Sequence, residues 1–203
     1  MAKPAPPKSS SLTAPAKDFA GMKTRLEGLH AAMKANPNFK VKRFEISPPS
    51  QVANAPAPLK ALAAAFDGAT FEWELQGAER TAGAIKFPKV AEVLKSIGTG
   101  THESDSYVLM PGLAHGSIEL VSGGEEVLVY DRDSGEVMTA GVDVLSAYDA
   151  QIDSLGIRAW ELRYYDDLDE TEDDDGGDGL FTKQGDLLDA VDRAWAALGL
   201  RAP

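Results

Sequence analysis

The order in which helical and extended apolar patterns follow one another is the feature that most constrains the fold of this sequence. The first clear pattern predicts a helix that begins after Asp18, a suitable N-cap, and ends at Asn36-Pro37-Asn38. Its apolar residues recur at spacings of three and four, which places them on one helix face: Phe19, Met22, Leu26, Leu29 and Met33.

Short extended segments dominate the rest of the chain, and helical patterns interrupt them at irregular intervals. The sequence predicts strands at 39–46, 70–75, 84–87, 107–110, 117–121, 126–130 and 137–139, and helices at 59–66, 90–97, 142–155 and about 184–199. This order does not alternate as strictly as a doubly wound fold would. We therefore expect an α+β fold, with a largely antiparallel or mixed sheet flanked by helices and an extra C-terminal helix.

The first 17 residues differ in composition from everything that follows. They read MAKPAPPKSSSLTAPAK, are rich in Pro, Ala, Ser and Lys, and offer almost nothing to bury. We expect a disordered N-terminal arm at 1–17 and a single folded domain at 18–203, a length that can enclose one core. Trp73, Trp160 and Trp195 each lie among other apolar residues, so we expect all three in that core.

Composition also bounds the location and chemistry of the protein. The chain has no run of about 18 apolar residues, and Met1 to Lys17 lacks the apolar region of a secretory signal. It contains no cysteine, which excludes disulfides and thiolate-bound zinc or iron–sulfur clusters. We expect a cytoplasmic protein that binds no membrane and needs no cofactor.

Charge is distributed unevenly along the chain, whose net value is −12. Residues 1–45 carry nine Lys or Arg against three acids, whereas the stretch from Asp166 to Asp178 holds nine acids and no base. Because nucleic-acid affinity comes largely from Lys and Arg contacts with phosphates, an acidic chain of this kind is a poor nucleic-acid binder. It favours encounter with a basic protein surface instead.

Histidines and other chemically active residues form few recognisable patterns. His30 lies beside the apolar face of the first predicted helix, which indicates a surface or boundary residue. His102, Glu103 and Asp105 lie close enough together in sequence to ligate a metal, although such a loop is more often simply solvated. His115 lies in Gly112–Gly116, which matches neither a nucleophile elbow nor a phosphate-binding loop. We expect no enzymatic activity.

The acidic tract at 166–179 invites a calcium-binding interpretation, which its spacing does not support. An EF-hand loop needs Gly at its sixth position and Glu at its twelfth. A loop starting at Asp173 has Asp178 at the sixth position, and one starting at Asp174 has Gly185 at the twelfth. Two interpretations stay open: a solvated, self-repelling loop, or an electrostatic arm that captures a basic partner.

Ala57 to Leu62, followed by Phe66-Asp67-Gly68, resembles the opening helix and turn of the SUKH superfamily. That superfamily includes fungal cell-wall assembly regulators and many bacterial immunity proteins. The other matching motifs are Phe71-Glu72-Trp73, Gly83 to Phe87, Val127 to Asp131, Gly135 to Val137, Ser146-Ala147-Tyr148 and Leu155 to Trp160. Together the resemblance covers about residues 20–165.

The resemblance implies an α+β fold without a catalytic centre. It further implies a protein that neutralises a cognate toxin, often a nuclease, by binding it, as many bacterial members do. The chain departs from the family pattern in its long acidic insert, in its C-terminal helix and in the turn Asp67-Gly68-Ala69, which lacks a second glycine. These departures bear on which surface such a partner would contact.

Charge and resemblance together lead us to expect an immunity-type protein that binds a basic, nuclease-like toxin domain. One alternative is a non-catalytic regulatory or scaffold domain that binds another cellular protein, and a weaker one is a metal-dependent enzyme. The expected partner contacts are the acidic residues of one hairpin and of the acidic tract: Asp131, Asp133, Glu136, Asp166, Asp167, Asp169, Glu170, Glu172, Asp173, Asp174, Asp175 and Asp178.

Overall fold

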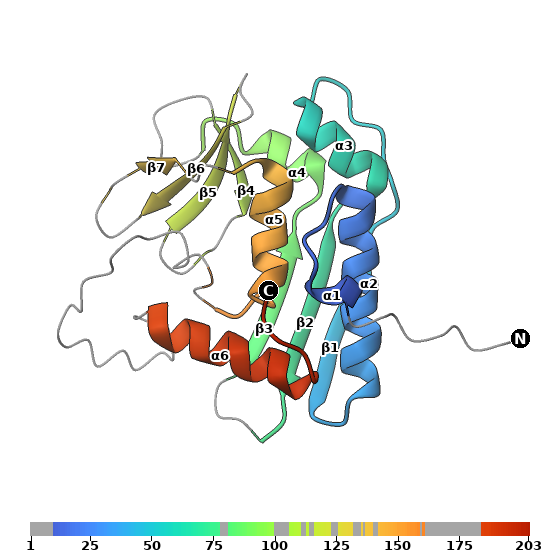
Figure 1. Cartoon of the computed structure of the whole chain (residues 1–203). Helices are drawn as coiled ribbons and strands as arrows, with labels where there is room; N and C mark the ends of the chain where they lie inside the picture. Colours follow the sequence, from blue (N-terminus) through green and yellow to red (C-terminus); the bar gives the residue numbers. More distant parts are fainter. Residues whose placement is uncertain are drawn as a thin grey trace, which may run out of the picture.

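The computed structural model of the chain describes residues 10–77, 81–99, 106–110, 113, 116–122, 126–131, 135, 137–139, 142–158, 160 and 184–203. These residues form an α+β fold of helices and two antiparallel sheets (Figure 1). The helices are α1 (Ser10–Thr13), α2 (Phe19–Ala35), α3 (Ala57–Ala65), α4 (Val90–Lys95), α5 (Val144–Asp153) and α6 (Gln184–Ala197). The strands are β1 (Phe39–Ile46), β2 (Ala69–Leu75), β3 (Ala82–Phe87), β4 (Ser106–Met110), β5 (Gly116–Val121), β6 (Val127–Asp131) and β7 (Val137–Thr139).

The first sheet has the order β1-β2-β3, and both of its strand pairs are antiparallel. Side chains of β2 alternate between buried and half-buried, so Phe71 and Trp73 face one side while Glu72 faces the other. In the register, Phe71 lies between Phe44 and Ile85, which gathers large apolar side chains on the same face. That face is the one that the helices cover.

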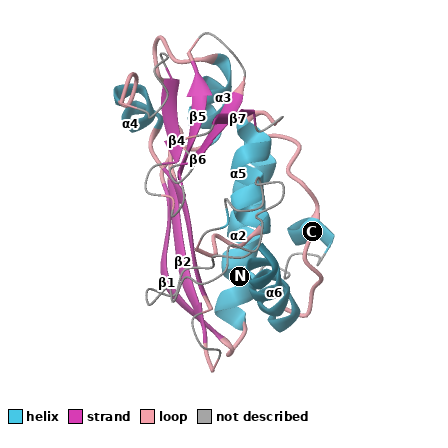
Figure 2. Cartoon of the chain, turned by 90° about the vertical axis from the view of Figure 1, so that its left-hand side faces the viewer, coloured by secondary structure: helices cyan, strands magenta, loops and turns pink. Residues whose placement is uncertain are grey.

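Helices α2, α5 and α6 lie together on this apolar face of the first sheet (Figure 2). Helix α2 begins as predicted, because the Asp18 carboxylate accepts a hydrogen bond of 2.6 Å from the Gly21 backbone N–H. The side chain of Asn36, at the C-cap of α2, donates to the carbonyl of Ala197 at 2.7 Å and so attaches the end of α6. Trp195 of α6 donates its indole N–H to the carbonyl of Asp153 at 2.8 Å.

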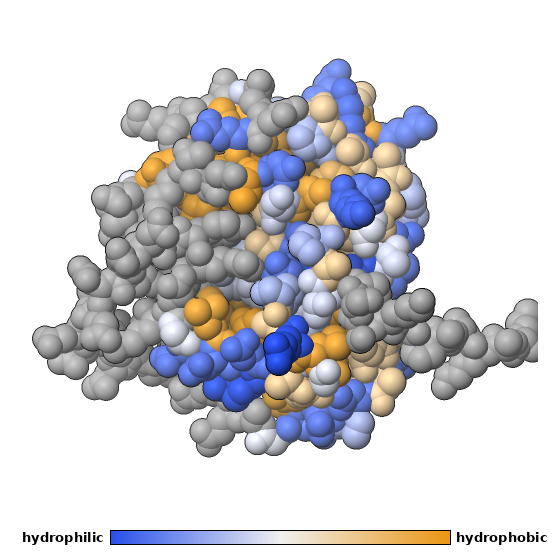
Figure 3. Space-filling view, viewed as in Figure 1, coloured by the Kyte–Doolittle hydropathy of each residue, from blue (hydrophilic) through white to orange (hydrophobic). Residues whose placement is uncertain are grey.

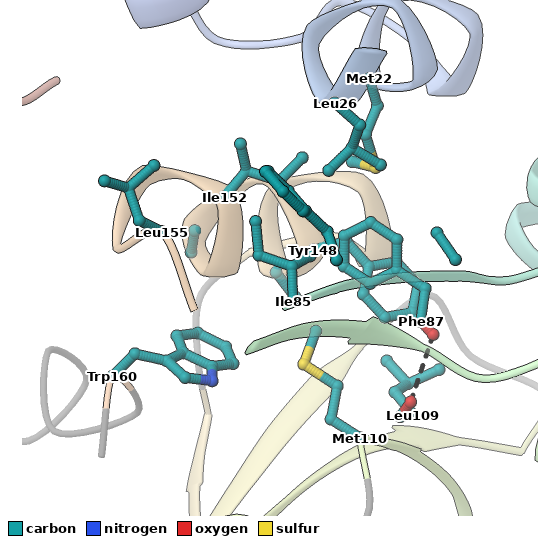
Figure 4. Packing of buried hydrophobic residues seen from close by; sticks show 14 of the residues in the cluster. Met22, Leu26, Ile85, Phe87, Leu109, Met110, Tyr148, Ile152, Leu155 and Trp160 are labelled. Atoms are coloured by element: carbon teal, nitrogen blue, oxygen red, sulfur yellow. Dashed lines mark hydrogen bonds between the residues drawn. The ribbon is translucent and has the colours of Figure 1, made fainter. Parts of the chain in front are cut away.

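Tyr148 of α5 connects the helices to both sheets (Figure 4). Its ring centroid lies 4.6 Å from that of Phe87 on β3, and its hydroxyl donates to the carbonyl of Leu109 on β4 at 3.3 Å. Complete burial raises the pKa of Tyr148, so the phenol remains a protonated donor. Met22, Leu26, Ile85 and Ile152 lie around it (Figure 4), and all four are fully buried.

The second sheet is a meander of the order β4-β5-β6-β7, in which all pairs are antiparallel. We expected one sheet, and the structure has two. Helix α4 intervenes between β3 and β4 in the chain, and the outer edge of β3 is already occupied by the turn after α5. There Ala84 N–H donates to the carbonyl of Gly156 at 2.7 Å, and Gly83 forms an antiparallel bridge with Ile157.

The expectation of a disordered arm at 1–17 is wrong for residues 10–17, whereas residues 1–9 lie outside the described part. Helix α1 packs against the fold, and Leu12 is 4% exposed. The composition of this segment does not reveal the packing, because only one leucine side chain and two backbone groups take part in it. The Leu12 carbonyl accepts from Arg25 Nε at 2.7 Å, and the Ala16 N–H donates to Asp149 Oδ2 at 2.8 Å.

Arg25 is the centre of a buried ionic cluster between α1, α2 and α5. The residue is 3% exposed, and its guanidinium contacts Asp149 Oδ1 at 2.7 Å and Asp153 Oδ1 at 2.6 Å. Charges this deeply buried need both ionic and hydrogen-bond partners. The cluster therefore fixes the N-terminal segment and the two helices relative to one another.

Two glycines permit the close contact between β3 and the turn that follows α5. Trp73 donates its indole N–H to the carbonyl of Leu155 at 2.9 Å, directly beside Gly83. A methyl group at position 83 would lie 2.2 Å from that carbonyl oxygen and 2.5 Å from the indole nitrogen. Gly156 has a φ of +62°, and a methyl group there would lie 2.5 Å from the backbone of Ala84.

We expect Gly83→Ala to lower the free energy of unfolding by about 1–3 kcal/mol, because the methyl group displaces the turn from β3. Gly185→Ala is the matched control, since Gly185 lies in α6 with nothing near the position of an added methyl group. The control should leave stability unchanged or raise it by about 0.5–1 kcal/mol through helix propensity. Urea denaturation of both variants measures the difference, and equal stabilities would contradict the packing described.

Candidate functional site

The face of the first sheet that points away from α2, α5 and α6 is the candidate site. Figure 2 shows this sheet from its edge, with those helices on one side only. Opposite the helix-covered face, β2 presents Thr70, Glu72 and Glu74, and β3 presents Ala82, Ala84 and Lys86. Strand β1 contributes four charged, exposed residues: Lys40, Lys42, Arg43 and Glu45.

A shift in register brings two consecutive basic residues of β1 onto this face. Val41 pairs with Trp73, but the next pair joins Arg43 to Glu72, so Lys42 is an extra residue in β1. Both Lys42 and Arg43 are exposed, while Phe44 returns to the helix-covered face. Without the bulge, strict alternation would turn one of these two residues inward.

Opposite charges alternate across the open face and form ion pairs. Arg43 contacts Glu45 Oε2 at 2.7 Å, Lys86 Nζ lies 3.3 Å from Glu72 Oε1, and Lys42 pairs with Glu74. The hydrogen bond and charge of Arg43 lower the pKa of Glu45, and the hydrogen bond from Lys42 lowers that of Glu74. Such exposed pairs contribute little to stability, so they are available to exchange partners.

The open face is the floor of a hollow of about 1050 Å³, which we call the trough. Its floor has small side chains, among them Thr70, Ala82 and Ala84. One wall is formed by Pro88, Lys89 and Glu92 at the start of α4, and another by Met110, Leu113, Arg158 and Trp160. The surface over the helices on the other side of the molecule also mixes polar and apolar residues (Figure 3).

The charge of the trough differs in sign from that of the chain. Its lining includes five basic residues, Lys42, Arg43, Lys86, Lys89 and Arg158, and three acids, Glu45, Glu72 and Glu92. The whole chain carries −12. The acidic residues singled out in the sequence do not include this surface, although the charged residues of 40–45 and the alternating Glu72 and Glu74 are its signal.

The partner contacts predicted from sequence lie almost entirely outside the described residues. This holds for Asp133, Glu136 and all the predicted acids from Asp166 to Asp178. Asp131 ends β6, where its backbone pairs with Gly116 of β5. These predictions therefore stay predictions, and the described residues add the trough as a separate candidate surface.

His102, Glu103 and Asp105, which the sequence analysis weighed as metal ligands, also lie outside the described residues, as does His115. Within the described part of the chain, no three His, Asp or Glu residues are grouped so that they could hold a metal ion. The three tryptophans are buried as expected: Trp73 is 1% exposed, Trp160 2% and Trp195 0%.

His30 lies at the boundary between α2 and the first sheet, as its position in the sequence indicates. Its ring stacks on Phe44 at a centroid distance of 3.9 Å and an interplanar angle of 9°, and meets the edge of Phe71 at 6.0 Å. Burial, and secondarily the charge of Lys34, lowers the pKa of His30 below its usual value. The fold therefore favours the neutral imidazole.

Acidification should consequently destabilise the protein through His30. Because the folded pKa lies below the unfolded one, this contribution is complete above about pH 6.5 and is lost as the pH falls through the folded pKa. His30→Phe keeps a stacked ring without a titrating group. Denaturation from about pH 7.5 to about pH 5 should show a smaller loss of stability in the variant, and identical losses would contradict this role.

No protein-family model, curated protein or solved structure matches this chain. The similarity to the SUKH superfamily thus rests on the sequence motifs alone. Among the residues that the structure describes, no helix is long and apolar enough to cross a membrane.

Proposed function

We propose that this chain acts in the cytoplasm by binding another protein, and that it is an immunity-type protein that neutralises a basic, nuclease-like toxin domain. The division of charge between two parts of the chain is the observation that carries this proposal. The described residues include 14 of the 20 Lys and Arg and 16 of the 32 acids, so they are nearly balanced. The remaining residues hold 16 acids against only six basic residues.

A dense run of acids beside a nearly neutral fold has a specific consequence for association. A run of like charges in the sequence produces a local negative potential that raises the rate of encounter with a positive surface. Nuclease domains expose positive surfaces because their substrate is a polyanion. Short-range contacts then set the lifetime of the complex, as most differences in affinity between related complexes arise in dissociation.

The steering role of the acidic tract can be tested with a matched pair of variants. In the first, Asp173, Asp174 and Asp175 are replaced with Asn. In the second, three exposed acids of the helices, Glu27, Asp189 and Asp192, are replaced with Gln or Asn, which changes the net charge equally. A basic protein recovered from cell lysate with the wild-type chain serves as the partner.

We expect the tract variant to associate roughly threefold to tenfold more slowly at low salt, and to lose much of its salt dependence. The helix variant should differ little from wild type. Stopped-flow association rates measure both. Equal slowing in the two variants would assign the effect to net charge alone, and an unchanged rate in the tract variant would contradict steering.

Inhibition of the partner is the measurement that separates an immunity protein from a regulatory or scaffold domain. The recovered protein should degrade nucleic acid when alone and stop when the chain is added in equimolar amount. A partner whose activity is unaffected by saturating amounts of the chain would contradict the immunity role and favour a scaffold.

A further inference from the structure

We propose that the trough on the open face of the first sheet binds an extended, acidic segment of a protein partner. This inference concerns a different surface from the acidic tract, and it holds whether or not the partner is a toxin. Three observations carry it: the net charge of the lining, the shape of the floor and the mixture of acidic and basic residues in the lining.

The charge of the lining favours a ligand with net negative charge. Basic residues outnumber acids five to three in the trough, although acids outnumber basic residues by twelve in the whole chain. The basic side chains of the floor are accessible, since the Arg43 side chain is 51% exposed and that of Lys86 is 62% exposed. An acidic ligand would compete with Glu45 for Arg43 and with Glu72 for Lys86, but it would displace no buried side chain.

The shape of the floor favours an extended peptide main chain over a compact protrusion of a folded domain. Along β3 the open face presents the small side chains of Ala82 and Ala84 before Lys86. On β2, Thr70 lies beside Lys86, whereas Glu72 and Glu74 lie beside the two alanines. Small side chains leave room for a backbone to lie close to the sheet, while the longer Arg43 and Lys86 reach up beside it. A volume of about 1050 Å³ corresponds to several residues of a peptide.

The mixture of charges favours a peptide over a nucleic acid. Glu45, Glu72 and Glu92 are interspersed with the basic residues of the lining. They would repel a continuous phosphate backbone, which is charged at every step. In a peptide, the same carboxylates can accept hydrogen bonds from backbone N–H groups or contact occasional basic side chains.

A labelled peptide of about twelve residues, in which Glu or Asp alternates with Val or Thr, is a direct probe. Fluorescence anisotropy of this peptide gives Kd for the wild-type chain, for Lys86→Gln/Lys89→Gln in the trough, and for Lys34→Gln/Lys60→Gln as the matched control. The control residues are exposed on α2 and α3 and do not line the trough. Thermal melting verifies that both double variants are folded.

We expect the wild-type chain to bind the acidic peptide, and the trough variant to raise Kd roughly tenfold, as two partly exposed charge contacts are lost. The control variant should raise Kd less than about twofold. No binding to the wild type, or equal weakening in both variants, would overturn the proposal. Tighter binding of a single-stranded DNA of the same length would overturn it in favour of a nucleic acid. None of these results depends on Asp173, Asp174 or Asp175, so the steering test of the acidic tract stands or fails separately.

Discussion

The hydrogen bonds that join the first sheet to the turn after α5 determine how the rest of the molecule is arranged. The Ala84 N–H of β3 donates to the Gly156 carbonyl at 2.7 Å, and the Trp73 indole of β2 donates to the Leu155 carbonyl at 2.9 Å. The backbone contacts of Gly83 and Ala84 with the turn occupy the outer edge of β3, so the sheet ends there and β4 begins a second one. They also carry the chain from the helix layer around the edge, so that Arg158 and Trp160 reach the wall of the trough.

Local patterns in the sequence were sufficient to predict every described helix and strand except α1, because their apolar periodicity reflects the faces that become buried. Helix α2 begins and ends at the caps predicted from Asp18 and Asn36, and β1 covers the predicted residues 39–46. The division into two sheets was not predictable in this way. It depends on a close contact between Gly83-Ala84 and Gly156-Ile157, two segments that are far apart in the sequence. In the sequence, neither glycine differs from an ordinary strand or turn glycine.

The same limit applies to the N-terminal segment and to the site. The composition of residues 10–17 does not indicate that this segment packs against the fold. In the structure, Arg25 and Asp149, which are far apart in the sequence, form hydrogen bonds with its backbone. The trough depends on the bulge at Lys42 and on the register of β2 against β3, which assemble scattered charges into one surface. Composition identified the acidic excess of the chain, but it could not show that the open sheet face has the opposite sign.

The most direct test of the account is whether a ligand touches the open face of the sheet at all. Ala82 is exposed on this face and Ala31 is exposed on α2, so each can be replaced by benzoylphenylalanine at comparable exposure. Irradiation with the acidic peptide should crosslink it to position 82 and leave position 31 unmodified. Equal crosslinking at both positions, or crosslinking at position 31 alone, would contradict the assignment of the trough as a binding surface.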